Sequence, residues 1–475
     1  MTAFSDQKSR VFVATELSKK DKSFRIVELE LQPMHERGAR DFNFPDIEGQ
    51  RPIFDEVLFF GQRILACATT YSKEEELVRS WAFWCSVDSG ITGGPILLSE
   101  HPSGRRTDDK MFGYVLNSDS TALLIHPREN FAIKNSRKPS YRLVDENLET
   151  IWEKNLDFPA PVDLLVNKEY RVDKNGQLYM LSGVAKQIKA RKETQALRSE
   201  GFSVAIYNPD ENKIKEFEVD LDEKWVHSAD YAISDDGNLI IAGFFSNDRY
   251  FSITGTYFFK IDGNTKQIAA KSLNPFTEDY LKLFSKNRND KFETELEDVY
   301  FDNLFLTKDD GVILTGENYN YSLQYRTDIT TGRQQVMYYY YYNDVVSVRL
   351  DNEGKEMWAA RTPKFQETVN DDGTRSSYAA AISNDALYLV FNDNPVNSER
   401  WTEDNTASLK VFNNNRRDIV SSATILRDGQ QTRNNPQGNN EGSTLLNPKF
   451  NLRVGNSLIV MARTRKEVRF ARIQF

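Results

Sequence analysis

The sequence contains few of the residues from which common catalytic and metal sites are built. Its 475 residues include only two cysteines and four histidines. The four histidines lie in dissimilar contexts, so no metal site has the usual ligand spacing, and we expect neither a metal nor a cofactor. The G-x-S-x-G, phosphate-loop and H-E-x-x-H motifs are also missing. With 70 acidic residues, spacing alone cannot select a glycosidase pair, so the sequence favours a non-catalytic protein and leaves an enzyme open.

Long apolar runs and concentrated positive charge are also missing. No run reaches the roughly 18 residues of a transmembrane helix, so we expect membrane association only through a partner. The net charge is −9, and basic residues are interspersed with acidic ones. A nucleic-acid-binding protein normally carries a basic stripe, so we expect no nucleic-acid partner.

A short unit made of an apolar stretch, a tight polar turn and a second apolar stretch recurs along most of the chain. Its turns centre near Gly61, Ser118, Asn175, Asp236, Asp310, Asn384 and Gly455. Hairpins recurring at such intervals are typical of radial β-repeats, because one twisted sheet cannot bury both its faces alone. The sequence therefore predicts an all-β fold, a single β-propeller domain spanning residues 1–475. Seven blades are expected, with eight as the alternative, and the N- and C-terminal strands are expected to close the ring.

A second motif follows several of these hairpins. Asp145 precedes Trp152 in DENLETIW, and Asp351 precedes Trp358 at the same spacing in DNEGKEMW. The polar residue is expected to open a turn, and the aromatic residue to return inward between neighbouring blades.

The two cysteines lie in segments that we expect to pair as a hairpin turning near Glu75 and Glu76. This register places Cys67 and Cys85 roughly opposite each other, within reach of a disulfide. The other interpretation is that they are two buried thiols acting as small hydrophobic residues.

Four segments are expected to be insertions into the repeats. They span about 184–200, 275–295, 318–343 and 428–445. The first is expected to be a lysine-rich helical segment, the second a short helix with Thr277 as its N-cap, and the last a polar loop.

The insertion at 318–343 is the most distinctive. We interpret it as an extended hairpin that turns around Thr330 to Gly332. Strand alternation places Met337, Tyr339 and Tyr341 on one face, and Tyr338, Tyr340 and Tyr342 on the other. Tyrosine suits glycan stacking or protein contact, so Tyr338, Tyr339, Tyr340, Tyr341 and Tyr342 form the candidate interaction surface. The alternative is that these rings pack on an adjacent blade and on one another.

His227 is the candidate catalytic residue. It lies at the entry of an inner strand in KWVHSADYAISDDG, where propeller channels open. A lone histidine there also fits a hydrogen-bonded structural role.

One stretch carries a family resemblance. YYYYYNDVVSVRLDNEGKEMWAARTPKFQ, followed by SSYAAAISNDALYLVFNDNPVNS, resembles uncharacterised exported β-propeller-like proteins of Bacteroidota over about Tyr338 to Asn397. This resemblance implies an exported, envelope-associated propeller of unknown function, located in the periplasm or at the cell surface. The first residues, MTAFSDQKSRVF, show no apolar signal core, which leaves the cytoplasm as the alternative.

The expected function is therefore a non-catalytic binding or scaffold propeller that contacts a protein or glycan partner. The alternative is a polysaccharide-directed hydrolase or lyase with a site at the central channel.

Overall fold

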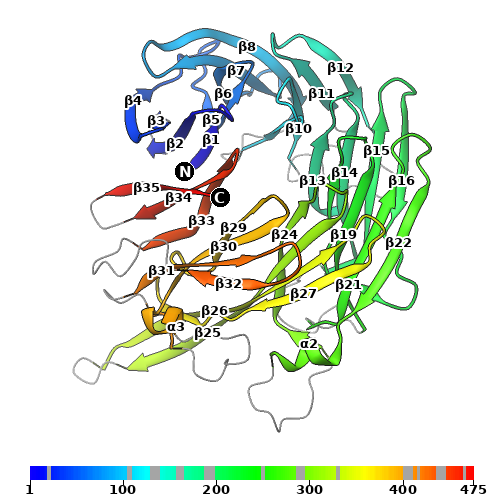
Figure 1. Cartoon of the computed structure of the whole chain (residues 1–475). Helices are drawn as coiled ribbons and strands as arrows, with labels where there is room; N and C mark the ends of the chain where they lie inside the picture. The colour runs from blue at the N-terminus through cyan, green and yellow to red at the C-terminus, as the bar shows by residue number, and fades with distance from the viewer. Residues whose placement is uncertain are drawn as a thin grey trace. The chain divides into compact units, whose positions relative to one another are not determined.

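The structure is a computed structural model in which all sheets are antiparallel (Figure 1). It describes residues 1–18, 23–103, 110–128, 140–156, 165–186, 198–247, 252–284, 295–327, 332–399, 410–413, 418–434, 445–463 and 467–475. The chain divides into two compact units, Met1–Val219 (unit 1) and Asp220–Phe475 (unit 2). The prediction of one domain over residues 1–475 stays a prediction.

Unit 1 contains four sheets of four strands each, in which each strand pairs with the next along the chain. The first consists of β1 (Thr2–Ser5), β2 (Arg10–Ser18), β3 (Ser23–Leu31) and β4 (Met34–Phe42). The second consists of β5 (Ile53–Phe60), β6 (Arg63–Ser72), β7 (Leu77–Ser86) and β8 (Gly90–Pro102). The third consists of β9 (Phe112–Leu116), β10 (Ala122–Pro127), β11 (Ser140–Asp145) and β12 (Thr150–Asn155). The fourth consists of β13 (Leu165–Val172), β14 (Leu178–Lys186), β15 (Arg198–Asn208) and β16 (Lys213–Glu218).

Unit 2 contains four larger sheets and one two-stranded ladder. The first consists of β17 (Trp225–Val226), β18 (Asp230–Ile233), β19 (Leu239–Ser246), β21 (Gly255–Ile261) and β22 (Ile268–Pro275). The second consists of β24 (Val299–Leu306), β25 (Val312–Thr327), β26 (Gln334–Leu350), β27 (Glu356–Thr362) and β28 (Gln366–Val369). The third consists of β29 (Tyr378–Ser383), β30 (Ala386–Asp393), β31 (Ile419–Ile425) and β32 (Gln431–Asn434). The fourth consists of β33 (Leu446–Val454), β34 (Ser457–Arg463) and β35 (Val468–Gln474), and the ladder of β20 (Ser252–Ile253) and β23 (Leu296–Glu297).

The cores lie between consecutive sheets. Within unit 1, one apolar cluster joins the first and second sheets, including Phe12, Phe24 and Phe83, and a second joins the second and third. Within unit 2, separate clusters join each sheet to the next. Every inner sheet therefore buries both its faces, which explains why β6 is buried at every position from Ile64 to Thr70.

The predicted hairpin turns are confirmed. Six of the seven join the first two strands of a sheet, as at Gly61, between β5 and β6, and Asn384, between β29 and β30, and the turn at Asp236 joins β18 to β19. Gly61 and Gln62 both have positive φ, as do Asn384 and Asp385, which is the geometry of a tight two-residue hairpin.

The aspartate–tryptophan motif also forms as predicted. The carboxylate of Asp145 accepts hydrogen bonds from the backbone N–H groups of Asn147 and Glu149, at 2.9 and 2.8 Å. Trp152 is buried, and its indole donates to the carbonyl of Gly176 (3.0 Å), in the first hairpin turn of the next sheet. The indole thus ties one sheet to the next.

The ends of the chain differ from the prediction. Residues Thr2–Phe42 form a sheet of their own, and the C-terminal sheet contains only β33, β34 and β35 among the described strands. Among the described residues, no N-terminal strand pairs with β33, β34 or β35. The extra sheet was missed because the turn after β1 contains no glycine and is held by the Asp6 carboxylate, which accepts from the N–H groups of Lys8, Ser9 and Arg10. The chain thus has eight sheets of three to five described strands, and their closure into a propeller ring stays a prediction.

The insertions have mixed outcomes. Thr277 caps α2 (Glu278–Lys282) as predicted, since its side chain accepts from the N–H of Tyr280, and the rest of that segment, 285–294, lies outside the described residues. The helix expected in 184–200 falls largely on residues 187–197, which are also outside them. Part of the loop expected at 428–445 is strand β32, and a helix that was not predicted, α3 (Pro395–Glu399), follows β30.

The disulfide alternative is wrong. Both cysteines are free and buried. In the β6–β7 hairpin Cys67 lies opposite Ala82, and Cys85 lies opposite Ile64. This three-residue offset places the thiols on opposite faces, in two different apolar clusters.

We expect Trp152→Ala to lower the free energy of unfolding by about 3–5 kcal/mol, because it leaves a cavity between two sheets and removes the bond to Gly176. The neighbouring control is Ile151→Ala, whose side chain is 53% exposed. This control should cost less than about 1 kcal/mol in urea denaturation. Equal losses for the two variants would contradict the role of Trp152 between the sheets.

Candidate functional site

A cluster of ionisable side chains lies where three consecutive sheets of unit 2 meet. Asp302 comes from β24 and Glu317 from β25, whereas Tyr378 begins β29 and Lys449 lies in β33. Lys364 joins them from the connection between β27 and β28. We call these five residues the Asp302 cluster.

Asp302 occupies a β-bulge. The β24–β25 register shifts between Phe301 and Asn303, so Asp302 is the extra residue of the bulge. The Tyr378 hydroxyl donates to its carboxylate at 2.7 Å and also lies 2.8 Å from the hydroxyl of Thr315. Because tyrosine has one hydroxyl proton, Thr315 must donate to Tyr378 whenever Tyr378 donates to Asp302.

The environment of Asp302 makes it a candidate acid or base. Asp302 is exposed to solvent, but many protein atoms surround its carboxylate and partly desolvate it. Burial, followed by repulsion from Glu317, raises the pKa of Asp302 to about 7, although the Tyr378 hydrogen bond and the charges of Lys364 and Lys449 oppose this. A carboxyl group that solvent can reach and that titrates near neutrality can both accept and release a proton.

Glu317 and Lys364 form a buried ion pair beneath Asp302. Their charged atoms are 2.5 Å apart, and both side chains are almost completely buried. Lys364 also donates to the carbonyl of Tyr342 and to the side chain of Gln366, each at 3.0 Å. Glu317 also accepts from the Ser377 hydroxyl at 2.6 Å. All three donors of the ammonium group are therefore used, which fits a structural role.

Lys449 differs from Lys364 in being exposed. Its ammonium group donates to the Tyr342 hydroxyl at 2.5 Å and lies 4.4 Å from the centre of that ring. Burial of its surroundings lowers the pKa of Lys449, opposed by the charge of Glu317. No described carboxylate lies within ion-pair distance of Lys449.

The tyrosine hairpin forms as predicted and extends beyond its sheet (Figure 1). β24 pairs with β25 only as far as Asn318, and β25 and β26 continue together to Thr327 and Gln334. The expected turn at Thr330 to Gly332 lies mostly outside the described residues. Cross-strand pairs place one set of apolar side chains on a single face, which we call the aromatic face: Tyr319, Tyr321, Leu323, Tyr325, Val336, Tyr338, Tyr340 and Tyr342.

The outer part of the aromatic face stands in solvent. Tyr321 is 58% exposed, Tyr325 71% and Tyr338 44%. Within the predicted surface Tyr338–Tyr342, Tyr338 alone is exposed. Tyr339, Tyr340 and Tyr341 are half-buried, and Tyr342 is buried. Tyr342 thus does not stand in solvent, because Lys449 and the loop at Gly373 cover its ring, and the interaction surface Tyr338–Tyr342 stays a prediction.

The aromatic face leads to the Asp302 cluster. The ring of Tyr319 lies 4.5 Å from that of Tyr342 and 5.8 Å from that of Tyr300, centre to centre. Tyr342 in turn contacts Lys449. A molecule lying along Tyr325 and Tyr321 would therefore have its inner end near Lys449.

His227 is not part of this cluster. It lies between β17 and β18, and burial alone lowers its pKa to about 4, so its imidazole is neutral at pH 7. Its Nδ1 has no hydrogen-bond partner among the described residues, and no carboxylate orients the ring. These contacts give it none of the partners that a catalytic histidine needs.

Unit 1 contains a closed counterpart of the Asp302 site. Asp55 is the extra residue of a bulge in β5 and accepts from the Thr69 hydroxyl at 2.5 Å and the Tyr114 hydroxyl at 3.1 Å. As in unit 2, the tyrosine comes from the first strand of the next sheet. Asp55 is completely buried, and burial raises its pKa to about 7. The same arrangement is thus sealed in unit 1 and open in unit 2.

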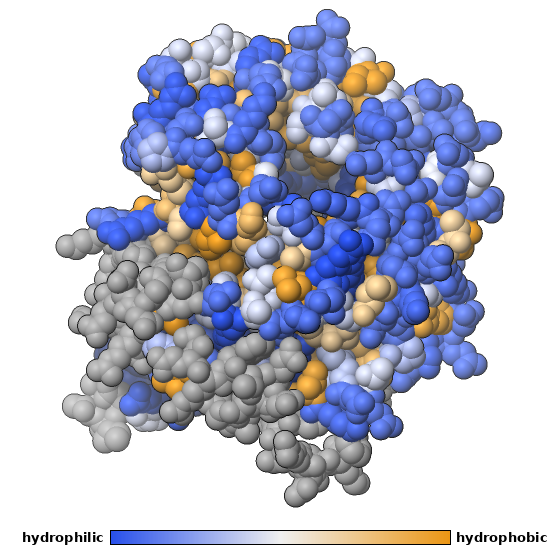
Figure 2. Space-filling view, in the orientation of Figure 1, coloured by the Kyte–Doolittle hydropathy of each residue, from blue (hydrophilic) through white to orange (hydrophobic). Residues whose placement is uncertain are grey.

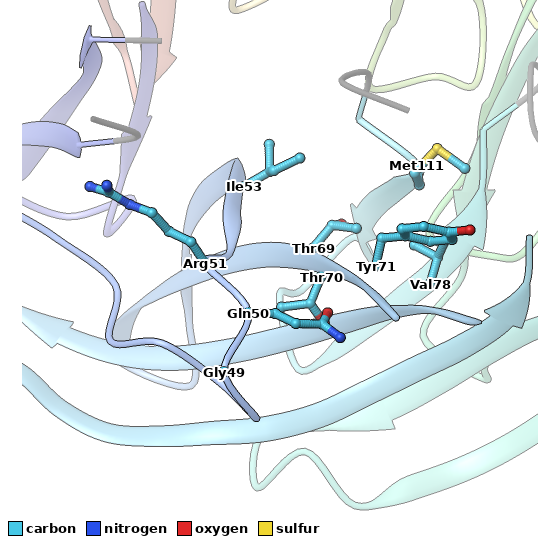
Figure 3. A pocket seen from close by; sticks show the side chains of 9 residues that line it. All are labelled: Gly49, Gln50, Arg51, Ile53, Thr69, Thr70, Tyr71, Val78 and Met111. Carbon is cyan, nitrogen blue, oxygen red and sulfur yellow. The ribbon is translucent and has the colours of Figure 1, made fainter. Parts of the chain in front are cut away.

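A pocket of about 250 Å³ lies near this counterpart (Figure 3). Tyr71, Val78 and Met111 lie together on one side, and Arg51 lies on the other. The remaining lining residues are Gly49, Gln50, Ile53, Thr69 and Thr70. Asp55 does not line this pocket, so the pocket offers hydrogen-bonding groups without the buried acid.

The described part of the chain has neither a metal-binding cluster nor a membrane-spanning helix. No group of three or more His, Cys, Asp or Glu is placed to hold a metal ion, and no helix there has the length and apolarity to span a membrane. The face shown in Figure 2 is mostly hydrophilic, with scattered hydrophobic patches.

Comparison with known proteins finds only solved structures of low identity and low TM-score. The chain matches no protein-family model and no curated protein sequence. Among solved structures it is similar to the Dos1 propeller (8% identity, 97% of this chain and 89% of that one, TM-score 0.45). It is also similar to the β-propeller domain of the Trilobed protease from Pyrococcus furiosus (10%, 82% and 88%, 0.36) and to a PL25 polysaccharide lyase, an ulvan lyase (10%, 86% and 90%, 0.37). These similarities support no specific function.

We expect Lys364→Met to lower the free energy of unfolding by about 3–5 kcal/mol, because it leaves the Glu317 carboxylate buried without a counter-charge. Adding Glu317→Gln should recover most of this loss. The exposed Lys355→Met serves as the matched control in urea denaturation. A loss as small as that of the control would show that the ion pair does not hold this junction.

Asp55 should make stability depend on pH in a defined direction. Its pKa is about 7 in the folded chain against an ordinary value of 3.8. The protonated Asp55 therefore stabilises the fold fully below pH 3.8, and this stabilisation is lost as the pH rises towards 7. Asp55→Asn cannot ionise. The difference in free energy of unfolding between this variant and the wild type should therefore shift in favour of the variant by roughly 1 kcal/mol per pH unit between about pH 5 and pH 7. Urea denaturation at several pH values tests this, with the exposed Asp210→Asn as control. A difference that does not change with pH would contradict the prediction.

Proposed function

We propose that this protein binds a glycan chain on the aromatic face of the β25–β26 hairpin. The observation that carries the proposal is the row of exposed rings on one face, Tyr321, Tyr325 and Tyr338, beside the exposed Leu323 and Val336. On the opposite face, β25 carries the polar residues Asn320, Ser322 and Gln324. Their cross-strand partners on the same face are Tyr341, Tyr339 and Met337 of β26.

The chemistry of this face favours a sugar over an apolar protein segment. Tyrosine rings offer flat apolar area and a hydroxyl that hydrogen-bonds, and sugars present both CH groups and hydroxyls. Alternate residues of a strand lie about 7 Å apart, so the rings form a ladder suited to an extended chain. The ladder ends at charged groups, Lys449 and Asp302, which suit a polar ligand.

Two further parts of the function are proposals of the same kind. Closure of the consecutive sheets into a propeller would make the hairpin an arm of a larger binding module. A location in the periplasm or at the cell surface of Bacteroidota follows from the resemblance over Tyr338 to Asn397 and suits a glycan partner. The second candidate function is a polysaccharide hydrolase or lyase, and the observation that favours it is the Asp302 cluster rather than His227.

Combined replacement of Tyr321, Tyr325 and Tyr338 by serine should weaken glycan binding at least 100-fold, since each ring contributes about 1 kcal/mol or more. The melting temperature should hardly change, because these rings are exposed. Retention on immobilised neutral and acidic polysaccharides, followed by calorimetry, measures the effect. The matched control is Tyr339→Ser with Tyr341→Ser, which removes rings from the other face. Binding that survives the triple replacement, or no retention of the wild type, would overturn the proposal.

A further inference from the structure

The exposed members of the Asp302 cluster lack the partners that comparable groups in this protein have. Glu317 is paired with Lys364, and Asp344 is paired with Arg361 at 2.6 Å. Asp302, by contrast, is bound by the hydroxyl of Tyr378, and Lys449 by the hydroxyl of Tyr342. Neither forms an ion pair with a described residue. An exposed acid and an exposed ammonium group are thus each held by one neutral hydroxyl.

The two groups are close enough to influence each other. The charge of Lys449 lowers the pKa of Asp302, and the charge of Asp302 raises that of Lys449. Each hydroxyl binds a charged group of another sheet. Tyr378 of β29 binds Asp302 of β24, and Tyr342 of β26 binds Lys449 of β33. The arrangement therefore presents a proton acceptor and a cation within one cluster at the inner end of the aromatic face.

We infer that this site cleaves a uronate-containing glycan by β-elimination, with Asp302 as the base, Lys449 as the partner of the sugar carboxylate and Tyr378 as the residue that positions Asp302. This inference rests on the proposed glycan binding, since the aromatic face would hold the chain.

The step balances without a metal or an oxidant. Asp302 takes the proton from C5, the carbon that bears the sugar carboxylate. The electron pair of that C–H bond forms a double bond between C4 and C5, and the bond from C4 to the glycosidic oxygen breaks. The leaving oxygen takes a proton from water, and Asp302 later returns its proton to water. Lys449 stabilises the negative charge that grows on the sugar carboxylate as the proton leaves.

Elimination fits the cluster better than hydrolysis does. A glycosidase normally needs two carboxyl groups on opposite sides of the bond. The acidic groups that act electrostatically on Lys449 besides Asp302 are Glu317 and Asp371. Glu317 is committed to Lys364 and Ser377. Asp371 accepts from the N–H of Gly373 at 3.0 Å with one oxygen, and its other oxygen is buried, out of reach of a bound chain. Asp302 is thus the exposed carboxylate and Lys449 the exposed cation of the cluster, and one base with one cation is the minimum set for elimination.

The site should also have a characteristic pH dependence. Asp302 must be ionised to act, so the rate should rise with pH through about 7. The groups that face it are Glu317, Tyr378, Lys364 and Lys449, from four different segments. Because the Tyr378 hydrogen bond lowers the pKa of Asp302, Tyr378→Phe should move the midpoint of the rate profile to higher pH. A merely structural role for Tyr378 would lower the rate without moving the midpoint.

The test uses the full chain with three probes: polygalacturonate, alginate and hyaluronan. We expect at least one polymer to yield the ultraviolet absorbance of a 4,5-unsaturated uronate. Asp302→Asn should lower that rate by roughly 10²–10⁴-fold, and Lys449→Gln should lower kcat as well as raise KM. The exposed Glu353→Gln should leave the rate unchanged. Thermal melts show whether each variant is folded.

Polymers whose carboxylates have been reduced to alcohols provide the second control, because they cannot undergo this elimination. Cleavage of the reduced polymers, or products without the double bond, would identify hydrolysis and overturn the inference. Retention of the polymers without any unsaturated product would overturn it while leaving the proposed glycan binding intact. Loss of both retention and product formation would overturn both.

Discussion

The buried contact between Glu317 and Lys364 is the interaction on which the described junction of unit 2 depends. Lys364 reaches β25 and β26, and Gln366, which it also binds, donates to the carbonyl of Asn392 in β30. Asn392 exchanges two hydrogen bonds with Leu446 in β33. One charged contact thereby begins a polar chain through three sheets. Because these polar groups are buried, breaking one hydrogen bond leaves its partner buried without a hydrogen bond, which is costly. The junction is therefore rigid.

That rigidity supports the exposed groups above it. Asp302 and Lys449 are held by tyrosine hydroxyls whose rings pack into the same junction, so their positions are set by the fold rather than by a ligand. In unit 1 the equivalent aspartate is sealed behind Thr69 and Tyr114. The bulge with its tyrosine partner is therefore a structural device of the repeat, and unit 2 differs by leaving it open to solvent.

Much of the fold follows from the sequence because it rests on local chemistry. The turns at Gly61 and Asn384 need residues that tolerate positive φ, and the Asp145–Trp152 spacing encodes a turn and a packed ring. The N-terminal sheet was missed because its turn is built from a carboxylate that accepts backbone hydrogen bonds, without glycine. The Asp302 cluster was missed because its members are far apart in the chain. A local signal did exist: Phe-Asp interrupts an apolar first strand in IFDEVLFF and again in YFDNLFL. The predicted pairing of Cys67 with Cys85 was wrong by three residues, because composition alone does not fix the register between two strands.

The hairpin of β25 and β26 has a consequence for how this protein can diversify. Its base is fixed by Tyr319 and Tyr342 and by β28, which pairs with Tyr339–Tyr342, whereas the pairs beyond Tyr338 join no other described strand. Inserting two residues into each arm would add one more rung to the row of rings and lengthen its reach. Inserting a single residue would instead invert every side chain beyond it and turn the rings to the polar side. Changes of hairpin length by even steps would therefore keep the aromatic face continuous, whereas odd steps would break it.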